Sequence, residues 1–398
     1  MNPDLQKLQP YPFERLAALK SGVTPPDKPH IALSIGEPKH DTPALVTAAL
    51  QAHLQQGLAS YPLTKGITEL RRTIANWLSA RFALAPDAVD PERHVLPVSG
   101  TREALFAFAQ AIIDRTRPAV VVSPNPFYQI YEGAALLAGA TPHFLACTAA
   151  NGLIPDFDAV DASVWRDCQL LYLCSPGNPT GAVMPLAQLQ SLIALAEKHD
   201  FIIAADECYS EIYFDEQQPP PGLLQAAAAM GNDSFRRCVV FHSLSKRSNA
   251  PGLRSGFIAG DADVLAAFLR YRTYHGCALP LQHQHASIAA WGDEQHVRTN
   301  RVMYRDKFDA VLAILDGCLE VTRPDAGFYL WPQTPVADDV FARELFAQQN
   351  VTVLPGRYLS REVAGRNPGA GHVRMALVAP IDECVEAAQR IKTFVNSL

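Results

Sequence analysis

Short apolar runs alternate with helical segments through the middle of this chain, and this alternation restricts the fold more than any other feature of the sequence. The segments between the runs, such as residues 101–113 and 184–199, repeat apolar residues at helical spacing. Strands that alternate with helices form a mostly parallel sheet covered by helices on both faces. The sequence therefore predicts an α/β fold. The expected strands lie at residues 93–98, 119–123, 169–174, 201–205, 238–242 and 256–260.

The pattern changes near Trp291, where a long helical segment of mixed polarity begins. Further strand-like runs and helical segments follow, which indicates a smaller α+β domain. The strand-like stretch at residues 31–38 is expected to join this smaller domain. The sequence therefore predicts a large domain at residues 46–289, with an N-terminal arm and the small domain at residues 1–45 and 290–398.

The charge and composition of the chain argue against several classes of protein. The net charge is −6 over 398 residues and no block of Lys or Arg stands out, so nucleic acids and anionic membranes are not expected as partners. No segment approaches the length of a membrane span, and the first residues lack an apolar signal sequence. The eight cysteines form no CxxC pair, which indicates reduced core thiols in a cytoplasmic protein. His283 and His285 lack supporting ligand spacing, so no metal site is predicted.

Polar residues gather directly after five of the expected strands. In an open α/β sheet, ligands bind outside the carboxyl ends of the strands, so these residues are expected to line one crevice. Each group alone has an ordinary explanation as a helix cap, a turn or a packed aromatic side chain. Their joint occurrence at the strand ends is what indicates a binding site. The groups are Ser99–Arg102, Pro124–Tyr128, Ser175–Gly181, Asp206–Tyr209 and Ser243–Lys246.

The stretch "SLSKRSNAPGLRSG" at residues 243–256 places Lys246 at the end of an apolar strand. One interpretation is a solvated turn that happens to hold several basic residues. The other is an amine that forms an imine with a carbonyl group, because a lysine at the end of a core strand is costly unless the protein uses it. The neighbouring polar groups favour the second interpretation and suit pyridoxal 5'-phosphate, whose aldehyde would react with Lys246.

Each part of pyridoxal phosphate has a candidate partner among these residues. Asp206 is expected to pair with the pyridine nitrogen, which must stay protonated for the ring to accept electrons. Asn178 and Tyr209 are expected to reach the phenolic oxygen, and Tyr128 to stack on the ring. The predicted phosphate ligands are Gly100, Thr101, Ser243, Ser245 and Arg254. The predicted catalytic residues are Lys246, Asp206 and Tyr209, and Arg102 is a further predicted cofactor contact.

The sequence resembles the class I/II, fold-type I, pyridoxal-phosphate aminotransferases over nearly its whole length. Residues 243–256 look like the lysine signature of that family, and "SPGNPTG", "DECY" and "PNPFYQIYEGA" match its asparagine, aspartate–tyrosine and stacking-aromatic motifs. Ser255 departs from the signature, which usually has an apolar residue there, and Gln129 stands where the stacking motif usually has proline. The resemblance implies the fold-type I architecture and a transamination between amino acids and keto acids.

Further matches imply roles that the residues alone would not suggest. Tyr61, in "YPLTKGITELR", matches a tyrosine that reaches the phosphate in the neighbouring subunit's site, which implies a homodimer. Gly36, in "SIGEP", matches a glycine that lies against the substrate carboxylate. Arg374, in "HVRMAL", matches the arginine that binds the substrate α-carboxylate, although by residue type alone it would be a surface residue. Asn178 is an implied substrate contact too, and its bond to Pro179 is implied to be cis.

Within this family, residues 1–22 and 245–257 look most like the N-succinyldiaminopimelate aminotransferases. Those enzymes act in the bacterial lysine and diaminopimelate pathway, and they exchange an amino group between N-succinyl-L,L-diaminopimelate and 2-oxoglutarate. A succinylated substrate has a distal carboxylate, which needs a cation. The candidates for that cation are Arg102, Arg247 and Lys39.

Other functions on the same scaffold stay open from the sequence. An aminotransferase of the aspartate or aromatic type, or a pyridoxal-phosphate carbon–sulfur lyase, would use the same cofactor residues. A non-catalytic regulator that binds the cofactor as an effector is disfavoured. Such regulators carry a DNA-binding helix-turn-helix ahead of this scaffold, whereas here the scaffold starts near residue 30 and no basic module is found.

Overall fold

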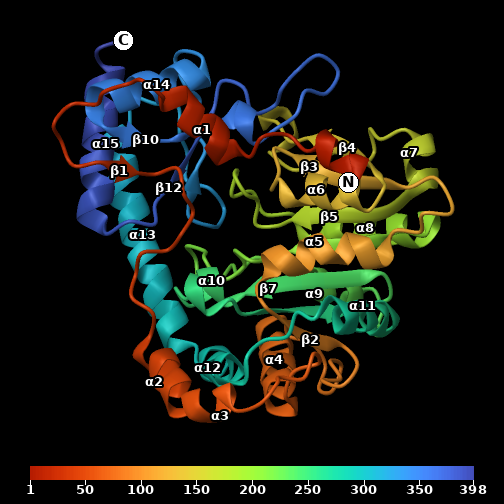
Figure 1. Cartoon of the computed structure of the whole chain (residues 1–398). Coiled ribbons are helices and arrows are strands. Elements are labelled where there is room, and N and C mark those ends of the chain that lie inside the picture. The colour runs from red at the N-terminus through yellow and green to blue at the C-terminus, as the bar shows by residue number, and fades with distance from the viewer.

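A seven-stranded sheet forms the centre of the structure, which is a computed structural model that describes all residues, 1–398. The strand order is β2-β8-β7-β6-β5-β3-β4, and only β8 runs antiparallel to its neighbours. Helices cover both faces of this sheet (Figure 1). The predicted mostly parallel α/β sheet is therefore confirmed. The strands are β2 Val95–Val98, β3 Val120–Asn125, β4 Thr141–Ala146, β5 Cys168–Cys174, β6 Ile202–Asp206, β7 Cys238–Ser243 and β8 Gly256–Gly260.

β4 is the strand of this sheet that the apolar pattern does not predict. It lies at the edge of the sheet and pairs only with β3. Most of its residues are only partly buried. An edge strand covers less apolar surface than an inner strand, so its sequence needs no continuous apolar run. All six predicted runs do contain strands of the sheet.

The inner strands are mostly apolar because both of their faces are buried. In β5, Leu171 and Leu173 belong to one core, while Leu170 and Tyr172 belong to the core on the other face. The first core includes residues of α4, α8, α9 and α12, and the second includes residues of α5, α6 and α11. Their bounds are α4 Thr68–Arg81, α5 Thr101–Ile112, α6 Ile130–Leu137, α8 Leu186–His199, α9 Leu223–Ala229, α11 Ala262–His275 and α12 Leu281–Trp291; the short α7 spans Ala162–Asp167.

A second group of elements has its own apolar core, at the upper left of Figure 1. β1 pairs in parallel with β10, and β9, β11 and β12 form a three-stranded antiparallel sheet. The predicted association of residues 31–38 with the C-terminal part is confirmed, whereas the domain limits themselves stay a prediction. The elements are β1 Ile31–Ala32, α13 Gln295–Leu315, β9 Tyr329–Leu330, α14 Asp338–Gln349, β10 Val351–Thr352, β11 Leu354–Pro355, β12 Val373–Ala376 and α15 Ile381–Val395.

The N-terminal segment runs along one side of the molecule and contacts both groups of elements (red to orange in Figure 1). Its short 3₁₀ helix at Pro3–Lys7 lies beside α6, and α1 (Pro12–Lys20) lies beside α14. Further along, α2 (Ala44–Ala52) and α3 (Leu54–Leu58) pack on α12. The residues between these helices therefore pass close to the boundary between the large sheet and the second group.

No helix combines the length and the apolar character that crossing a bilayer requires. The eight cysteines are all free, as predicted. The expectation that they lie in the core is only partly correct, because Cys174, Cys208, Cys277 and Cys318 are partly exposed. The bond between Asn178 and Pro179 is cis, which confirms that prediction.

Replacing Leu171 by alanine tests the assignment of β5 to the core. Leu171 is 1% exposed, so Leu171→Ala should lower the free energy of unfolding by about 2–5 kcal/mol. The measurement is a urea titration followed by circular dichroism. Leu5→Ala is the control, because Leu5 is 50% exposed, and it should cost less than about 1 kcal/mol. Equal losses in the two variants would contradict the assignment.

Candidate active site

A cavity of about 540 Å³ lies at the carboxyl ends of the parallel strands. Residues that follow β2, β3, β5, β6 and β7 all line it. The N-terminal segment and the second group of elements supply other parts of the wall, through Tyr11, Phe13, Tyr329 and Leu354. The structure thus brings together twelve of the residues singled out from the sequence: Gly36, Thr101, Arg102, Tyr128, Asn178, Asp206, Tyr209, Ser243, Ser245, Lys246, Arg254 and Arg374.

Lys246 lies on α10 (Leu244–Arg247), a short helix that begins directly after β7. Ser243 caps this helix, because its side-chain oxygen accepts a hydrogen bond from the Ser245 N–H over 3.1 Å. The Lys246 Nζ donates to the Gly36 carbonyl oxygen over 2.5 Å. Burial lowers the pKa of Lys246 to about 8, because the charged ammonium is poorly solvated there. A larger fraction of the amine is therefore unprotonated and nucleophilic near neutral pH.

Asp206 ends β6 and is 5% exposed. Its Oδ2 accepts a hydrogen bond from the Tyr131 hydroxyl over 2.7 Å, and its Oδ1 accepts one from the Cys208 N–H over 3.3 Å. Burial raises the pKa of Asp206, and the donors from Cys208 and Tyr131 oppose that rise. No Lys, Arg or His forms an ion pair with this carboxylate. A buried carboxylate with only neutral donors is suited to receive a cationic group of a ligand.

Tyr131 is a site residue that the sequence reasoning missed. It is 1% exposed on α6 and stacks on Tyr172 with the ring centroids 4.7 Å apart. The sequence does contain a signal for Tyr131, because it follows Tyr128 by three residues in the same motif. Residues three apart share one face of a helical turn, so a second tyrosine near the cofactor residues was a reasonable expectation.

Gly100 does not itself line the cavity, but it packs against Arg254, which does. Gly100 precedes α5 with φ of +88°, a conformation that glycine adopts readily. A Cβ atom at this position would collide with the Arg254 guanidinium. Arg254 lines the cavity, and its Nη1 donates to the Pro251 carbonyl oxygen over 2.9 Å. With Thr101 at the first position of α5, this corner has a cation, hydroxyls and free backbone N–H groups, which are the groups that bind phosphate.

Arg374 is buried on β12, with 5% exposure, so the assignment by residue type to the surface is wrong. Its Nη1 donates to the Asn178 Oδ1 over 3.0 Å, and its Nη2 donates to the Ser34 carbonyl oxygen over 2.7 Å. The Arg374 Nε has no hydrogen-bond partner. The guanidinium lies 4.6 Å from the centroid of the Tyr329 ring. An arginine held in this way, with donors to spare, is suited to bind a carboxylate.

Tyr329 is a second residue that the sequence reasoning missed. Its hydroxyl is 3.0 Å from the Tyr209 hydroxyl, and burial raises the pKa of both phenols. A Cβ atom on Gly36 would collide with the Tyr329 hydroxyl. Glycine at position 36 therefore lets the N-terminal segment approach this wall closely. Tyr329 lies in "GFYLWP", whose apolar pattern indicates a strand but no role in a site.

Tyr128 and Arg102 form another part of the wall. The Arg102 Nε donates to the Tyr128 hydroxyl over 2.5 Å. Burial raises the pKa of Tyr128, so the phenol stays protonated. The terminal nitrogens of Arg102 make no hydrogen bond to the protein. Tyr128 therefore fixes one edge of the guanidinium and leaves its other donors available.

The comparison with protein families decides what kind of site this is. Residues 28–391 match the family model described as aminotransferase class I and II. The chain belongs to that family. Over 393 residues it is 31% identical to an LL-diaminopimelate aminotransferase from Desulforudis audaxviator (strain MP104C), with 98% of this chain and 96% of that protein covered.

Solved aminotransferase structures have the same fold. An aminotransferase from Neisseria meningitidis superposes with a TM-score of 0.94 at 49% identity, with 99% of each chain covered. A probable N-succinyldiaminopimelate aminotransferase from Thermus thermophilus superposes with a TM-score of 0.84 at 27% identity, with 96% of this chain and 100% of that chain covered. The predicted fold-type I aminotransferase architecture is therefore confirmed.

Pyridoxal phosphate is the cofactor of class I and II aminotransferases, as predicted, and the cavity fits it. The corner formed by Gly100 and Arg254 has the donors for a phosphate, and Asp206 has no cationic partner of its own. Lys246 places an amine with a lowered pKa on the same wall. When bound, the cofactor supplies an aldehyde and an electron-accepting ring.

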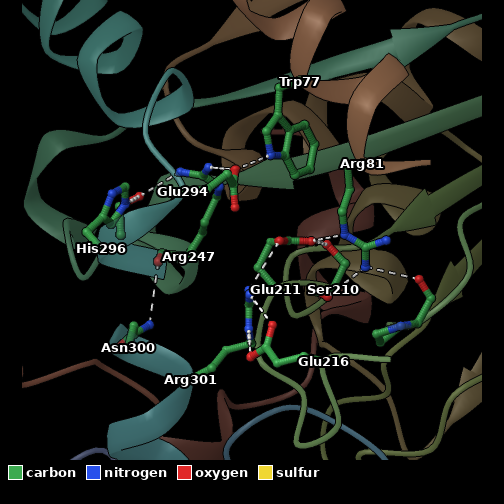
Figure 2. Close-up of polar contacts among 12 residues, drawn as sticks. Trp77, Arg81, Ser210, Glu211, Glu216, Arg247, Glu294, His296, Asn300 and Arg301 are labelled. Carbon is green, nitrogen blue, oxygen red and sulfur yellow. Dashed lines mark hydrogen bonds and ion pairs between the residues drawn. The ribbon is translucent and has the colours of Figure 1, made fainter. Parts of the chain in front are cut away.

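Arg247 does not line the cavity of this aminotransferase, which corrects its candidacy for a distal carboxylate. It is 1% exposed, and its guanidinium donates to the Ala290 carbonyl oxygen over 2.6 Å and forms an ion pair with Glu294 (Figure 2). Glu294 also accepts a hydrogen bond from the Trp77 indole over 2.9 Å. Arg247 thus anchors α10 to the start of α13 and has no donors facing the substrate.

Lys39 and Tyr61 also lie outside the cavity wall. The Lys39 Nζ pairs with Glu383 over 3.4 Å, so Lys39 is not the cation for a substrate in this cavity. Of the three candidates, only Arg102 lines the cavity. Tyr61 is fully exposed, and its role in a neighbouring subunit stays a prediction.

The pKa of Lys246 gives a direct test of its environment. In the cofactor-free protein, Lys246 should react with acetic anhydride with a pH midpoint near 8, because burial destabilises the ammonium. An ordinary lysine has its midpoint near 10.5. The reactive fraction should therefore rise with pH through 8 and be nearly complete at pH 10. Competitive labelling followed by peptide mapping measures this midpoint for Lys246 alone. A midpoint near 10.5 would contradict the burial of the amine.

Proposed function

We propose that this aminotransferase exchanges an amino group between N-succinyl-L,L-diaminopimelate and 2-oxoglutarate in the diaminopimelate pathway. The observation that carries the proposal is that one cavity contains two arginines with free donors, Arg374 and Arg102. Such an arrangement suits a substrate with a carboxylate at each end. The likeness to the probable N-succinyldiaminopimelate aminotransferase from Thermus thermophilus supports the same substrate.

The α-carboxylate end of the substrate is assigned to Arg374. Its fixed position between Asn178 and Ser34 pre-orients the guanidinium, so little freedom is lost when a carboxylate binds. Gly36 lines the cavity and, because it has no side chain, lets the N-terminal segment pack closely against the Tyr329 hydroxyl at this end. This assignment follows the implied roles of Gly36, Asn178 and Arg374 in substrate binding.

Lys246 is assigned as the proton carrier at the substrate Cα. A general base works best when its pKa is close to the operating pH, and the pKa of about 8 for Lys246 meets this condition. Asp206 would hold the cofactor ring in its protonated form, and Tyr209 would donate to the phenolic oxygen of the cofactor. Tyr131 would orient Asp206 through its 2.7 Å hydrogen bond.

A homodimer is part of the proposal because the Tyr61 side chain is fully exposed within its own subunit. Tyr61 is flanked by two further exposed apolar side chains, Leu58 at 69% and Leu63 at 70% exposure. Adjacent exposed apolar residues are typical of a surface that contacts another molecule. A second copy of this chain would place Tyr61 near its cofactor phosphate, as the family resemblance implies.

Unmodified L,L-diaminopimelate is the second candidate donor. The 31% identity with an LL-diaminopimelate aminotransferase over nearly the whole chain favours it. That donor has a distal ammonium as well as a distal carboxylate, whereas succinylation turns the ammonium into a neutral amide. Glu37 lines the cavity and would be the partner of such an ammonium.

A coupled assay for glutamate formation from 2-oxoglutarate tests the proposed reaction. N-succinyl-L,L-diaminopimelate should give a kcat/KM at least about tenfold above L,L-diaminopimelate, aspartate, alanine or aromatic donors, which corresponds to one well-made charged contact. Lys246→Ala is the control and should abolish turnover with every donor, because the covalent attachment and the proton carrier are both lost. A preference for L,L-diaminopimelate would select the second candidate. Activity with a simple amino acid alone would reject the pathway, and ammonia and pyruvate from cystathionine would indicate a carbon–sulfur lyase.

Variants of two residues that line the cavity, Arg102 and Glu37, distinguish the donors by the charge at the distal end of each donor. Arg102→Ala should lower kcat/KM for the succinylated donor about 10- to 100-fold, because a hydrogen bond to a charged group is lost, and should spare alanine, which has no distal carboxylate. Glu37→Gln should leave the succinylated donor unchanged, since an amide has no charge to pair. Steady-state kinetics with each donor measures both effects. Equal losses on the succinylated donor and on alanine in Arg102→Ala would exclude Arg102 as the distal cation.

A further inference from the structure

Two side chains of α12 contact the residues on either side of Arg254. The His283 Nδ1 is 2.9 Å from the Leu253 carbonyl oxygen. The Ser287 Oγ is 2.7 Å from the Ser255 Oγ. His283 and Ser287 are four residues apart, so both lie on the same face of α12. One helix face therefore holds the chain immediately before and immediately after Arg254.

The direction of these hydrogen bonds follows from the available protons. A carbonyl oxygen only accepts, so His283 must carry its proton on Nδ1 when it contacts Leu253. The Ser287 hydroxyl donates its single proton to the His283 carbonyl oxygen over 2.6 Å. Ser255 is therefore the donor in its contact with Ser287. Ser255 and Ser287 are 1% and 0% exposed, so water does not replace this contact in the folded chain.

Arg254 itself has a backbone conformation that a non-glycine residue seldom adopts. Its φ is +50° and its ψ is +51°, in the left-handed region. This conformation is disfavoured for a residue with a Cβ atom, so the surroundings must maintain it. The contacts to Leu253 and Ser255 restrain the peptide groups on both sides. Moreover, the Ser255 carbonyl oxygen accepts from the Leu244 N–H over 3.1 Å, which ties the same segment to the helix of Lys246.

We propose that His283, Ser287 and Ser255 are positioning residues for the phosphate contact of Arg254. None of the three lines the cavity, but they fix the direction from which the Arg254 guanidinium enters it. The hydroxyl of Ser255, where related sequences usually have an apolar residue, then has a defined purpose as the partner of Ser287. The proposal rests on the proposed assignment of Arg254 to the cofactor phosphate.

Pyridoxal phosphate and pyridoxal together isolate the phosphate contact, because they share the same ring and aldehyde. The test measures the Kd of each compound for the full chain after removal of its cofactor, by equilibrium titration. Their ratio is the phosphate preference. His283→Phe and Ser287→Ala should each reduce this preference about 3- to 10-fold, which is the usual effect of one hydrogen bond. Ser255→Ala should behave like Ser287→Ala, and His283→Gln, which keeps an N–H donor, should recover part of the preference.

His285→Phe is the matched control on the same helix. His285 stacks on His53 with the ring centroids 3.7 Å apart and makes no hydrogen bond to residues 253–255. A phenyl ring preserves that stacking, so the phosphate preference should stay unchanged. If His283→Phe and Ser287→Ala weaken both compounds equally, or lower only the melting temperature, the two residues are merely structural and the proposal is wrong.

Arg254→Ala separates this proposal from the assignment on which it rests. If Arg254→Ala removes most of the phosphate preference while the α12 variants do not, only the positioning role fails. If Arg254→Ala leaves the preference intact, the assignment of Arg254 to the phosphate fails, and the positioning role fails with it.

Discussion

The structure depends on the burial of two oppositely charged groups, Asp206 and Lys246, at one edge of its sheet. Each is costly when it is buried without a partner. Burial shifts their pKa values toward the neutral forms, upward for Asp206 and downward for Lys246. Neither group pairs with the other, and a cofactor with a ring nitrogen and an aldehyde provides what each lacks. The protein therefore needs firm supports around both residues, because the uncompensated arrangement is unfavourable on its own.

Those supports come from residues that do not line the cavity. Arg247 and Glu294 fix the helix of Lys246 to α13, and Arg81 donates to the buried Glu211 over 2.6 Å, two residues after Tyr209 (Figure 2). α12 contacts residues 253 and 255 on either side of Arg254 and packs on α2 and α3. The residues that line the cavity of this class I and II aminotransferase are thus held in place by ion pairs and apolar packing behind them.

The sequence was most informative where geometry leaves few choices. Parallel strands that are buried on both faces must be apolar, and their carboxyl ends must share one edge, so the apolar pattern was sufficient to bring Lys246, Asp206 and Asn178 together. The sequence pattern did not predict β4, because an edge strand does not need a continuous apolar run. Tyr131 could have been predicted from its helical spacing to Tyr128, whereas Tyr329 could not, because its contact with Tyr209 joins residues that are distant in the chain. Arg247 was wrongly expected near the substrate, because a residue beside Lys246 can project to either side of a short helix, and the sequence alone does not say which.

The contact between Arg374 and Ser34 joins residues 340 positions apart, and this separation has a consequence for synthesis of the chain. On the ribosome, the strand that precedes Gly36 emerges long before its partner β10 exists. The large sheet can form first, but the end of the cavity that contains Arg374 must wait until β10 and β12 have been translated. Contacts between distant segments close slowly, because a long loop loses entropy when it closes. A nascent chain that stops before β12 would therefore contain Lys246 without Arg374, and the cavity would be complete only after β12 has emerged.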